Sequence, residues 1–366
     1  EILARKDELG RLLSRDRVEV SAPDGSFEVQ VRKAIVLASG SKAATLPDLP
    51  IDEQRIVTSA GALSLTAAPR HLAVIGGGYV GLELGSVWRR LGSEVTVVEV
   101  LDRIASGVDS EMSTALHKVL EAQGFQFCLA HKVVGSRMEA DDVVLEVEPM
   151  GDGARGTIKA DVVLVSIGRR PATDGLDLET VGIKPDPRGY IPVDDGFRTS
   201  AEGVYAIGDV TAKLQLAHVA EAQGIIAAET IADAETLEIE DYMMTPRATF
   251  CNPQVASMGY TEEQAKEKWP DKDIKVATFP FTANGKAVGL NETAGFGKLV
   301  ADAEFGEILG CHLVGANVSE LMPEVVLAQR FDLTAGEIAR SIHIHPTLSE
   351  VLKEISHGVE GHMINL

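Results

Sequence analysis

Apolar runs and helix-length gaps alternate over residues 69–170. One run, Ala73–Ile75, leads into three glycines, and a second, Glu94–Glu99, follows after a gap long enough for a helix. The helices and further strands expected in this block lie over 79–91, 110–124, 125–129 and 160–166. Because strands that alternate with helices favour a parallel sheet with right-handed crossovers, this part of the chain predicts one α/β block.

The chain before this block follows other patterns. Residues 1–17 are charged with leucines at helical spacing, which predicts the end of a helix. Alternation of apolar and polar residues over Val18–Val31, around a Pro-Asp-Gly turn, predicts a β-hairpin. Residues 34–38 are apolar throughout and predict a buried strand.

After the α/β block, the pattern of predicted helices and strands changes at about residue 245. Before that point, a short strand over 204–207 is expected to end just before Asp209, and a helix is expected over 219–232. Residues 245–366 combine single strands, two amphipathic helices and a histidine-rich tail. They predict a separate α+β domain.

Three glycines, Gly76, Gly78 and Gly81, follow the first apolar run with the spacing G-x-G-x-x-G. If a dinucleotide binds here, Gly76 allows a tight turn, Gly78 leaves room for the pyrophosphate against bare backbone, and Gly81 lets the helix pack close to the strand. The helix that begins here would aim its N–H groups at the phosphates. The alternative is an ordinary buried βαβ unit with glycines at its turns.

Glu99 ends the second apolar run. It lies near the distance from the glycines at which a carboxylate accepts hydrogen bonds from an adenosine ribose. An acid at this position favours NAD over NADP, because its charge would repel a 2′-phosphate.

The composition restricts the possible function classes. The 366 residues carry a net charge of −21 and no apolar run of roughly 20 residues, which argues against nucleic acid and membrane partners. The three cysteines, Cys128, Cys251 and Cys311, are far apart, so neither a disulfide framework nor a zinc site is expected. Residues 1–6 show no signal-peptide pattern, and a cytoplasmic location is expected.

Five motifs in a consistent order resemble those of the pyridine nucleotide-disulfide oxidoreductases. Val74–Glu83 resembles the NAD fingerprint of this family, and Ile167–Pro171 resembles the end of its NAD domain. Tyr205–Asp209 resembles the second flavin motif, Leu216–Ala220 the segment beside the flavin ring, and His345–Glu350 the catalytic motif. The resemblance covers nearly the whole chain and is closest to the members that oxidise dihydrolipoamide.

The resemblance implies two Rossmann-like nucleotide-binding domains and an α+β dimerisation domain. The FAD domain is expected to be incomplete, with its remainder at 1–68 and its resumption at 171–243. The NAD domain, at 69–170, is inserted between them, and the dimerisation domain occupies 244–366. The implied cofactors are therefore FAD and NAD, and the implied assembly is a homodimer.

The implied reaction is the oxidation of protein-bound dihydrolipoamide, with electrons passing through a disulfide and FAD to NAD⁺. The implied partner is the lipoyl-bearing acyltransferase of a 2-oxo acid dehydrogenase complex. An NADH-dependent flavin or disulfide reductase of the same fold is the alternative within the family. A non-catalytic fragment that retains NAD binding and dimerisation is the alternative outside enzymes.

His345 and Glu350 are the predicted catalytic residues. A histidine five residues from a glutamate, across a Pro-Thr turn, can form an imidazole–carboxylate hydrogen bond that raises the basicity of the ring. Such a base could take a proton from a dithiol, and the resemblance implies that the pair serves the disulfide of a partner subunit. The alternative is a surface histidine at the start of a helix. No metal site is expected at His343 and His345, because too few further ligands lie nearby.

The resemblance also implies cofactor contacts. Glu83 is expected near the nicotinamide, although it could be an ordinary solvated helix residue. Asp209 is expected to bind the ribityl chain of the flavin, and it can cap a helix as well. Arg169 is favoured over its neighbour Arg170 as a cofactor contact. The remaining predicted contacts lie on the flavin side, at Ser39, Gly40, Gly208, Ala217 and His218. The turn Ser39-Gly40-Ser41 resembles a contact with the flavin adenine, and a plain turn is the alternative.

The chain departs from the family pattern in three places. It contains neither the flavin G-x-G-x-x-G nor the redox-active Cys-x-x-x-x-Cys that precedes the resembling region in family members. Leu9–Asp16 resembles a join from which a strand is missing. Phe250–Gln254 has cysteine and glutamine where many members have threonine and glutamate. We assign no catalytic role to any of the three cysteines, because free cysteine is commonly a small buried hydrophobe.

Overall fold

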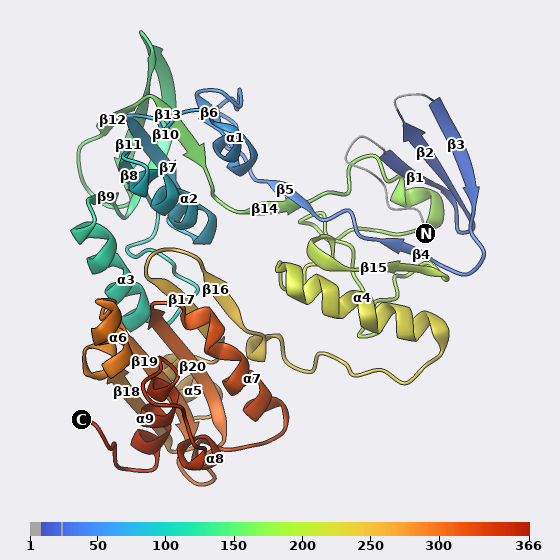
Figure 1. Ribbon diagram of the computed structural model, residues 1–366. Helices are drawn as coiled ribbons and strands as arrows, with labels where there is room; N and C mark the ends of the chain where they lie inside the picture. Colours follow the sequence, from blue (N-terminus) through green and yellow to red (C-terminus); the bar gives the residue numbers. More distant parts are fainter. Residues whose placement is uncertain (1–8, 23–24) are drawn as a thin grey trace. The chain divides into compact units, whose positions relative to one another are not determined.

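Two compact units make up the chain. The computed structural model describes residues 9–22 and 25–366 (Figure 1). Unit 1 comprises Glu1–Ala43 with Arg169–Tyr242, and unit 2 comprises Ala44–Gly168 with Met243–Leu366. The four predicted domain segments stay predictions, because unit 2 joins 44–168, here called the α/β region, and 243–366, the C-terminal region, into one body.

A five-stranded parallel sheet organises the α/β region. Its order is β6-β13-β7-β8-β9, and every neighbouring pair is parallel. The strands are β6 (Ile56–Val57), β7 (His71–Ile75), β8 (Glu94–Val98), β9 (Phe125–Cys128) and β13 (Val162–Val165). The helices are α1 (Ser59–Ser64), α2 (Tyr79–Arg90) and α3 (Ser110–Ala122). The α/β block predicted from the alternating runs is confirmed.

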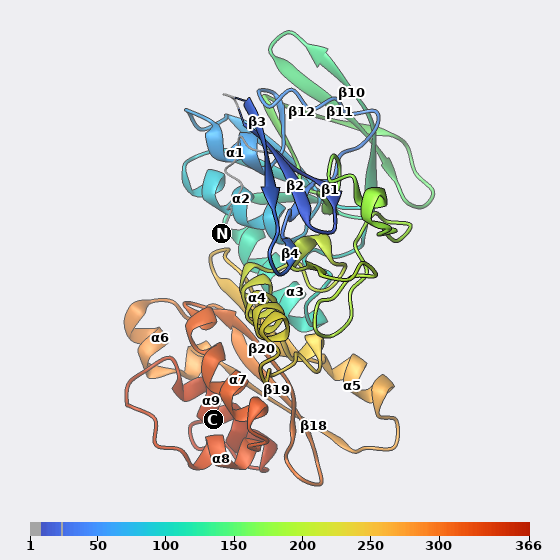
Figure 2. The ribbon, with the colours of Figure 1, turned by 90° about the vertical axis from the view of Figure 1, so that its right-hand side faces the viewer.

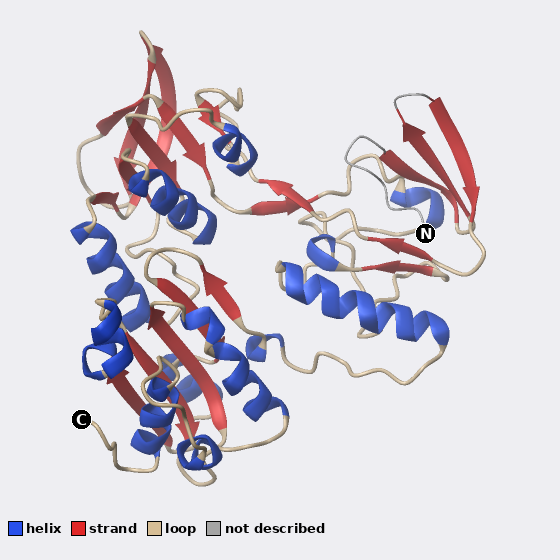
Figure 3. Cartoon of the chain, in the orientation of Figure 1, coloured by secondary structure: helices blue, strands red, loops and turns tan. Residues whose placement is uncertain are grey.

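Both faces of this parallel sheet are buried. Leu72 of β7 packs with Leu82 of α2 on one face, and both side chains are fully buried. Ile75 and Leu145 belong to the cluster on the other face. That face is covered by an antiparallel meander (Figure 3) of β10 (His131–Glu139), β11 (Asp142–Pro149) and β12 (Gly156–Ala160). Each such leucine contributes about 1.5–3 kcal/mol by burial, which stabilises the position of β7, the central strand that the glycine turn follows.

An antiparallel sheet forms the centre of the C-terminal region. Its order is β16-β17-β20-β19-β18. The strands are β16 (Arg247–Thr249), β17 (Gln254–Gly259), β18 (Ile274–Pro280), β19 (Phe296–Asp302) and β20 (Ile308–Gly315). The helices are α5 (Glu262–Lys268), α6 (Gly285–Leu290), α7 (Met322–Arg330), α8 (Ala335–Arg340) and α9 (Glu350–Val359). The predicted α+β character is confirmed, and the described residues form more helices here than the two expected.

The two faces of this antiparallel sheet have different neighbours. A Cβ added at Gly297 of β19 would meet Val351 and Ile355, so this face packs against α9 (Figures 1 and 2). The next residue, Lys298, points to the opposite face, where it contacts Asp109 at the start of α3 and Glu262 of α5. The α/β region and the C-terminal region therefore meet on the Lys298 face.

Unit 1 is built from three small sheets. An antiparallel sheet joins β1 (Leu9–Ser14), β2 (Arg17–Ala22) and β3 (Gly25–Gln30). A parallel pair joins β4 (Ile35–Leu37) to β15 (Val204–Ala206), and an antiparallel pair joins β5 (Ser41–Ala43) to β14 (Arg169–Pro171). The main helix of the unit is α4 (Ala217–Ala232). In neither unit do the described residues form a helix with the length and apolar character needed to cross a membrane.

The helix predicted for residues 1–17 is wrong where the structure describes it. Leu9–Ser14 forms strand β1, which pairs with β2 across a tight turn, while residues 1–8 lie outside the described residues. The side chain of Leu12 is buried, and its N–H donates to Leu176 O at 3.0 Å. The segment that resembled a join thus supplies a strand itself, because tertiary pairing outweighs a weak helical spacing of leucines. The predicted hairpin, β2–β3, is confirmed.

Candidate functional site

The three glycines after β7 occupy three different environments. Gly76 has φ +103°, and a Cβ there would lie 2.5 Å from Ser166 O. A Cβ at Gly81 would lie only 2.2 Å from Gly76 O. At Gly78, the N-cap of α2, no atom lies within 4 Å of the added Cβ. Two of the glycines are therefore required by the fold, and the third leaves open space beside the start of a helix.

The glycine turn lies at a reversal of strand order. β7 is flanked by β8 on one side and by β13 on the other, and the chain reaches these two neighbours by separate crossovers. Open parallel sheets bind ligands beyond the carboxyl ends of their strands at such a point. Ser166, just after β13, donates its hydroxyl to Ile75 O at 3.0 Å, which ties the two strand ends together.

Glu99 lies directly after β8 and contacts the glycine turn. Its Oε2 accepts the N–H of Gly77 at 2.6 Å, and its Oε1 accepts the N–H of Leu101 at 2.9 Å. A carboxylate has about four lone-pair sites, so each oxygen retains acceptor capacity for a further donor. The structure brings Glu99 to the turn, and its contact with a ribose stays a prediction.

Glu83 on α2 faces the C-terminal region rather than open solvent. Its carboxylate accepts the N–H of Phe250 at 2.8 Å. Burial raises the pKa of Glu83, and the Phe250 N–H only partly offsets this effect. Burial, with the nearby Glu83 charge, also raises the pKa of the Cys251 thiol. The predicted role of Glu83 near the nicotinamide stays a prediction.

His345 and Glu350 form the hydrogen bond that their spacing predicted. Nδ1 of His345 lies 2.9 Å from Oε1 of Glu350, while Oε2 accepts the N–H of Thr347 at 2.9 Å. An ionised carboxylate is acceptor-only, so Nδ1 carries the proton and Nε2 keeps its lone pair. The His345 side chain is 78% exposed and that of Glu350 is 17% exposed. The basic nitrogen Nε2 of His345 therefore belongs to a side chain that is accessible from outside unit 2.

Glu350 stays ionised in this arrangement. Burial acts to raise its pKa, but the Thr347 N–H and His345 outweigh that effect and hold the pKa below its usual range. Glu350 is also the first residue of α9, where a negative charge is favoured by the helix dipole. The charge of the carboxylate is therefore available to stabilise an imidazolium on His345.

The first histidine of the H-x-H sequence, His343, has a different environment. The His343 side chain is 5% exposed, and its Nε2 lies 3.0 Å from Oε1 of Glu324 on α7. Its Nδ1 lies 3.1 Å from Ser341 O, and Glu324 raises the pKa of His343. Glu324 was not predicted, because nothing in the sequence connects a helix residue to a loop histidine. Among the described residues, no group of three or more His, Cys, Asp or Glu side chains is arranged to hold a metal ion.

Two predicted cofactor contacts, Asp209 and Arg169, meet at Ser41 in unit 1. Asp209 follows β15, and its carboxylate accepts the hydroxyl of Ser41. Arg169 donates from Nε to Ser41 Oγ at 2.6 Å, and the same Nε lies 3.8 Å from Asp209 Oδ2. Gly208 has φ +73°, and its N–H donates to Gln223 Oε1 at 2.6 Å. Gln223 was missed as a site residue, and the contact of Ser41 with Asp209 was not predicted, since only the fold brings these residues together.

The other flavin-side residues lie nearby in the chain. Gly40 has φ +72° and accepts the N–H of Ala172 at 3.0 Å, which connects β5 to β14. Ser39 precedes it in the same turn. Ala217 and His218 form the first turn of α4. The contacts of these residues with a flavin stay predictions.

Comparison with known proteins shows the family. Residues 6–224 match the family model of pyridine nucleotide-disulphide oxidoreductases, and residues 245–356 match the dimerisation domain of that family. The chain therefore belongs to the pyridine nucleotide-disulphide oxidoreductases.

Its relatives by sequence include dihydrolipoyl dehydrogenases. That of Corynebacterium glutamicum is 54% identical over 330 residues, which are 90% of this chain and 70% of the relative. Dihydrolipoyl dehydrogenase 3 of Pseudomonas putida is 46% identical over 367 residues, and the match covers 99% of this chain and 78% of the relative.

Solved structures give the same fold at lower identity. LpdA from Mycobacterium tuberculosis is 27% identical with a TM-score of 0.87, covering 98% of this chain and 77% of that chain. The HOCl-induced flavoprotein disulfide reductase RclA from Escherichia coli has a TM-score of 0.86 at 27% identity, and the match covers 95% of this chain and 78% of that chain. The predicted fold class, with nucleotide-binding domains and a dimerisation domain, is confirmed.

Proposed function

We propose that the protein is an FAD- and NAD-dependent dihydrolipoyl dehydrogenase. The family match, with relatives of that name at 44–54% identity, supports this reading. The observation that carries it is the hydrogen-bonded pair of His345 and Glu350, with the basic nitrogen of the pair exposed. In the proposed reaction a dihydrolipoamide dithiol is oxidised and NAD⁺ is reduced.

The glycine turn and Glu99 are the residues proposed to hold NAD. The open space at Gly78 fits a pyrophosphate close to the backbone, because no neighbouring atom lies within 4 Å of an added Cβ. Glu99, already bonded to the N–H of Gly77, would accept the ribose hydroxyls. Its negative charge would disfavour the 2′-phosphate of NADP. Bound NAD⁺ supplies the final hydride acceptor of the reaction.

Asp209, with Ser41 and Arg169, is proposed to hold the ribityl chain and the phosphates of FAD. The carboxylate, hydroxyl and guanidinium are bonded to one another at the end of a parallel strand. Their donor and acceptor groups match the hydroxyls and phosphates of a flavin dinucleotide. When bound, FAD supplies the two-electron chemistry that connects a dithiol to a nicotinamide.

His345 is proposed to act as the general base. It would accept a proton from a substrate thiol at Nε2, while Glu350 holds Nδ1–H and stabilises the imidazolium. General-base assistance of this kind is worth roughly 10²–10⁴ in rate. Cys251 and Cys311 cannot serve as the reactive thiols, because both are buried and burial raises the pKa of Cys311 to about 12. We propose that His345 serves a redox disulfide of the partner subunit in a homodimer, formed by the Cys-x-x-x-x-Cys pair that family members carry and that the 366 residues of this sequence do not contain.

The proposed partners are a second copy of the chain and a lipoyl-bearing acyltransferase. The dimerisation-domain match supports a homodimer. The physiological dithiol is proposed to be the lipoyl group of an acyltransferase in a 2-oxo acid dehydrogenase complex, because relatives of 44–54% identity carry the dihydrolipoyl dehydrogenase name.

A second candidate is an NADH-dependent disulfide reductase. Similarity to RclA, itself a flavoprotein disulfide reductase, favours it. Steady-state assays of the full-length protein separate the two functions. The main proposal predicts turnover with dihydrolipoamide and NAD⁺ that exceeds NADH-driven reduction of glutathione disulfide or a quinone. Turnover only in the NADH-oxidising direction, with no use of lipoamide, would favour the reductase.

A further inference from the structure

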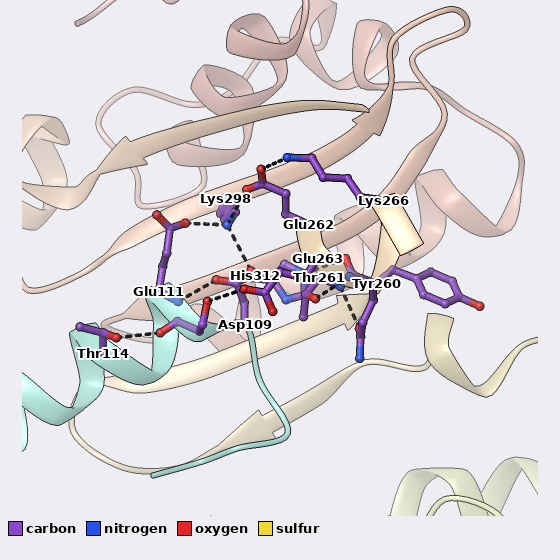
Figure 4. A network of polar contacts seen from close by, with 12 residues as sticks. Asp109, Glu111, Thr114, Tyr260, Thr261, Glu262, Glu263, Lys266, Lys298 and His312 are labelled. Atoms are coloured by element: carbon purple, nitrogen blue, oxygen red, sulfur yellow. Dashed lines mark hydrogen bonds and ion pairs between the residues drawn. The ribbon is translucent and has the colours of Figure 1, made fainter. Parts of the chain in front are cut away.

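A buried lysine connects the two regions of unit 2. Lys298 lies on β19, and its ammonium contacts Asp109 Oδ2 at 3.1 Å and Glu111 Oε2 at 2.5 Å (Figure 4). A third carboxylate, that of Glu262 on α5, lies 3.2 Å away. The side chains of Lys298 and Asp109 are each only 3% exposed. Charges buried so deeply need partners of opposite charge. Removing one charge of the cluster leaves its partners uncompensated, which is strongly destabilising.

Lys298 is the cation of this cluster. Burial acts to lower its pKa, but Glu111 and Asp109 outweigh that effect and raise the pKa above its usual value. His312 lies directly opposite on β20, with Nε2 3.0 Å from Tyr260 O. Burial lowers the pKa of His312, so the imidazole adds no second positive charge. The carboxylates at the start of α3 are therefore held by the lysine.

Asp109 uses its two carboxylate oxygens for two different purposes. Oδ1 accepts the N–H of Glu111 at 3.0 Å and caps the first turn of α3, while Oδ2 contacts Lys298. Glu111, the other close contact of the lysine, lies in that same turn. Lys298 thus fixes the position and direction of the first turn of α3 from the C-terminal region.

The first turn of α3 is joined to the glycine turn by two hydrogen bonds. Ser113 donates its hydroxyl to Ile104 O at 2.6 Å. The next residue, Ala105, donates its N–H to Gly77 O at 2.7 Å. The N–H of Gly77 in turn binds Glu99 Oε2. A shift at the start of α3 would therefore reach both the turn proposed to face the pyrophosphate and the carboxylate proposed to face the ribose.

We propose that Lys298 is a positioning residue for NAD, which acts from the C-terminal region to hold residues 104–109, and through them the glycine turn, in the binding geometry. This inference rests on the proposed NAD site. It assigns the C-terminal region a role in nucleotide affinity that is separate from dimerisation and from the base at His345.

The test is a comparison of Michaelis constants in the full-length protein. Lys298→Met removes the charge and keeps an unbranched side chain. We expect it to raise the KM for NAD⁺ and the Kd for NADH about tenfold, with the KM for dihydrolipoamide unchanged within about twofold. Lys272→Met is the matched control, because Lys272 pairs with Asp302 and Glu307 of the C-terminal region. The control variant is expected to leave both Michaelis constants unchanged.

A second variant covers the case in which Lys298→Met does not fold. Ser113→Ala removes the hydroxyl bonded to Ile104 and leaves the buried charges paired. It is expected to raise the KM for NAD⁺ about threefold without changing the KM for dihydrolipoamide.

Two results overturn the inference: a folded Lys298→Met protein that binds NADH like the wild type, or equal rises in both Michaelis constants. A wild-type protein that binds NADH but does not oxidise dihydrolipoamide refutes the proposed function instead. NADH titrations of the variants still test Lys298 in that case.

Discussion

Replacing Gly78 or Gly81 by alanine separates the folding of the glycine turn from its proposed role in binding NAD. The two glycines belong to the same turn, but only one is packed against neighbours. An added Cβ at Gly81 would lie 2.2 Å from Gly76 O and 2.6 Å from Ser166 Oγ, whereas at Gly78 it would meet nothing within 4 Å. Gly78 also has φ −83°, which alanine adopts without strain.

The expected effects on stability therefore differ. Overpacking costs about 1–3 kcal/mol, so Gly81→Ala should lower the free energy of unfolding by that amount. Gly78→Ala should lower it by less than about 1 kcal/mol, because alanine is only a poorer N-cap than glycine. Urea unfolding of both variants beside the wild type measures this difference.

Gly78→Ala is expected to weaken NADH binding although it hardly changes the stability of the protein. The methyl group of Gly78→Ala would occupy the open space proposed for the pyrophosphate. The Kd for NADH should therefore rise at least about tenfold, or about 1.4 kcal/mol, in a protein of nearly normal stability. Fluorescence titration with NADH gives the value. A folded Gly78→Ala protein that binds NADH like the wild type would refute the proposal that this turn holds the cofactor.

Three further predictions concern the C-terminal region and the cysteines. Glu350→Gln should lower kcat about 10²-fold, because the imidazolium loses its counter-charge; an exposed control at the other end of α9, Glu360→Gln, should not. His343 has a raised pKa, so its pairing with Glu324 stabilises the fold fully below about pH 6.5 and is lost as pH rises through the folded-state pKa. Unfolding curves should accordingly show that His343→Gln costs more stability at about pH 6 than at about pH 9, and an equal loss at both would contradict this. Cys251 and Cys311, buried with raised pKa values, should react with a thiol reagent more slowly than the partly exposed Cys128 in the native protein; mass spectrometry of the labelled peptides checks the order.

Local spacing explains what could be predicted from the sequence. The glycines and Glu99 lie within one βαβ unit, so their order along the chain is enough to indicate their geometry. The bond between His345 and Glu350 spans one turn and was predicted for the same reason. The helix prediction for Leu9–Ser14 was wrong because its leucines fit a helical spacing, whereas pairing with β2 and burial of Leu12 determined its structure.

Contacts between distant segments could not be predicted in this way. Lys298 lies 189 residues from Asp109, and Ser41 lies 168 residues from Asp209. The local sequence predicts neither contact, since lysine on a strand and serine after a glycine are both common. Their roles follow only from the parallel and antiparallel sheets that bring the segments together.

NAD⁺-dependent oxidation of dihydrolipoamide by the full-length protein is the decisive test of the proposed function. NADH formation is followed by absorbance for the wild type and for His345→Gln under identical conditions. We expect robust turnover for the wild type, weaker turnover with NADP⁺, and a loss of roughly 10²–10⁴ in the turnover of the variant. A flavin-loaded wild-type protein that forms no NADH from dihydrolipoamide, or a variant as active as the wild type, would contradict it.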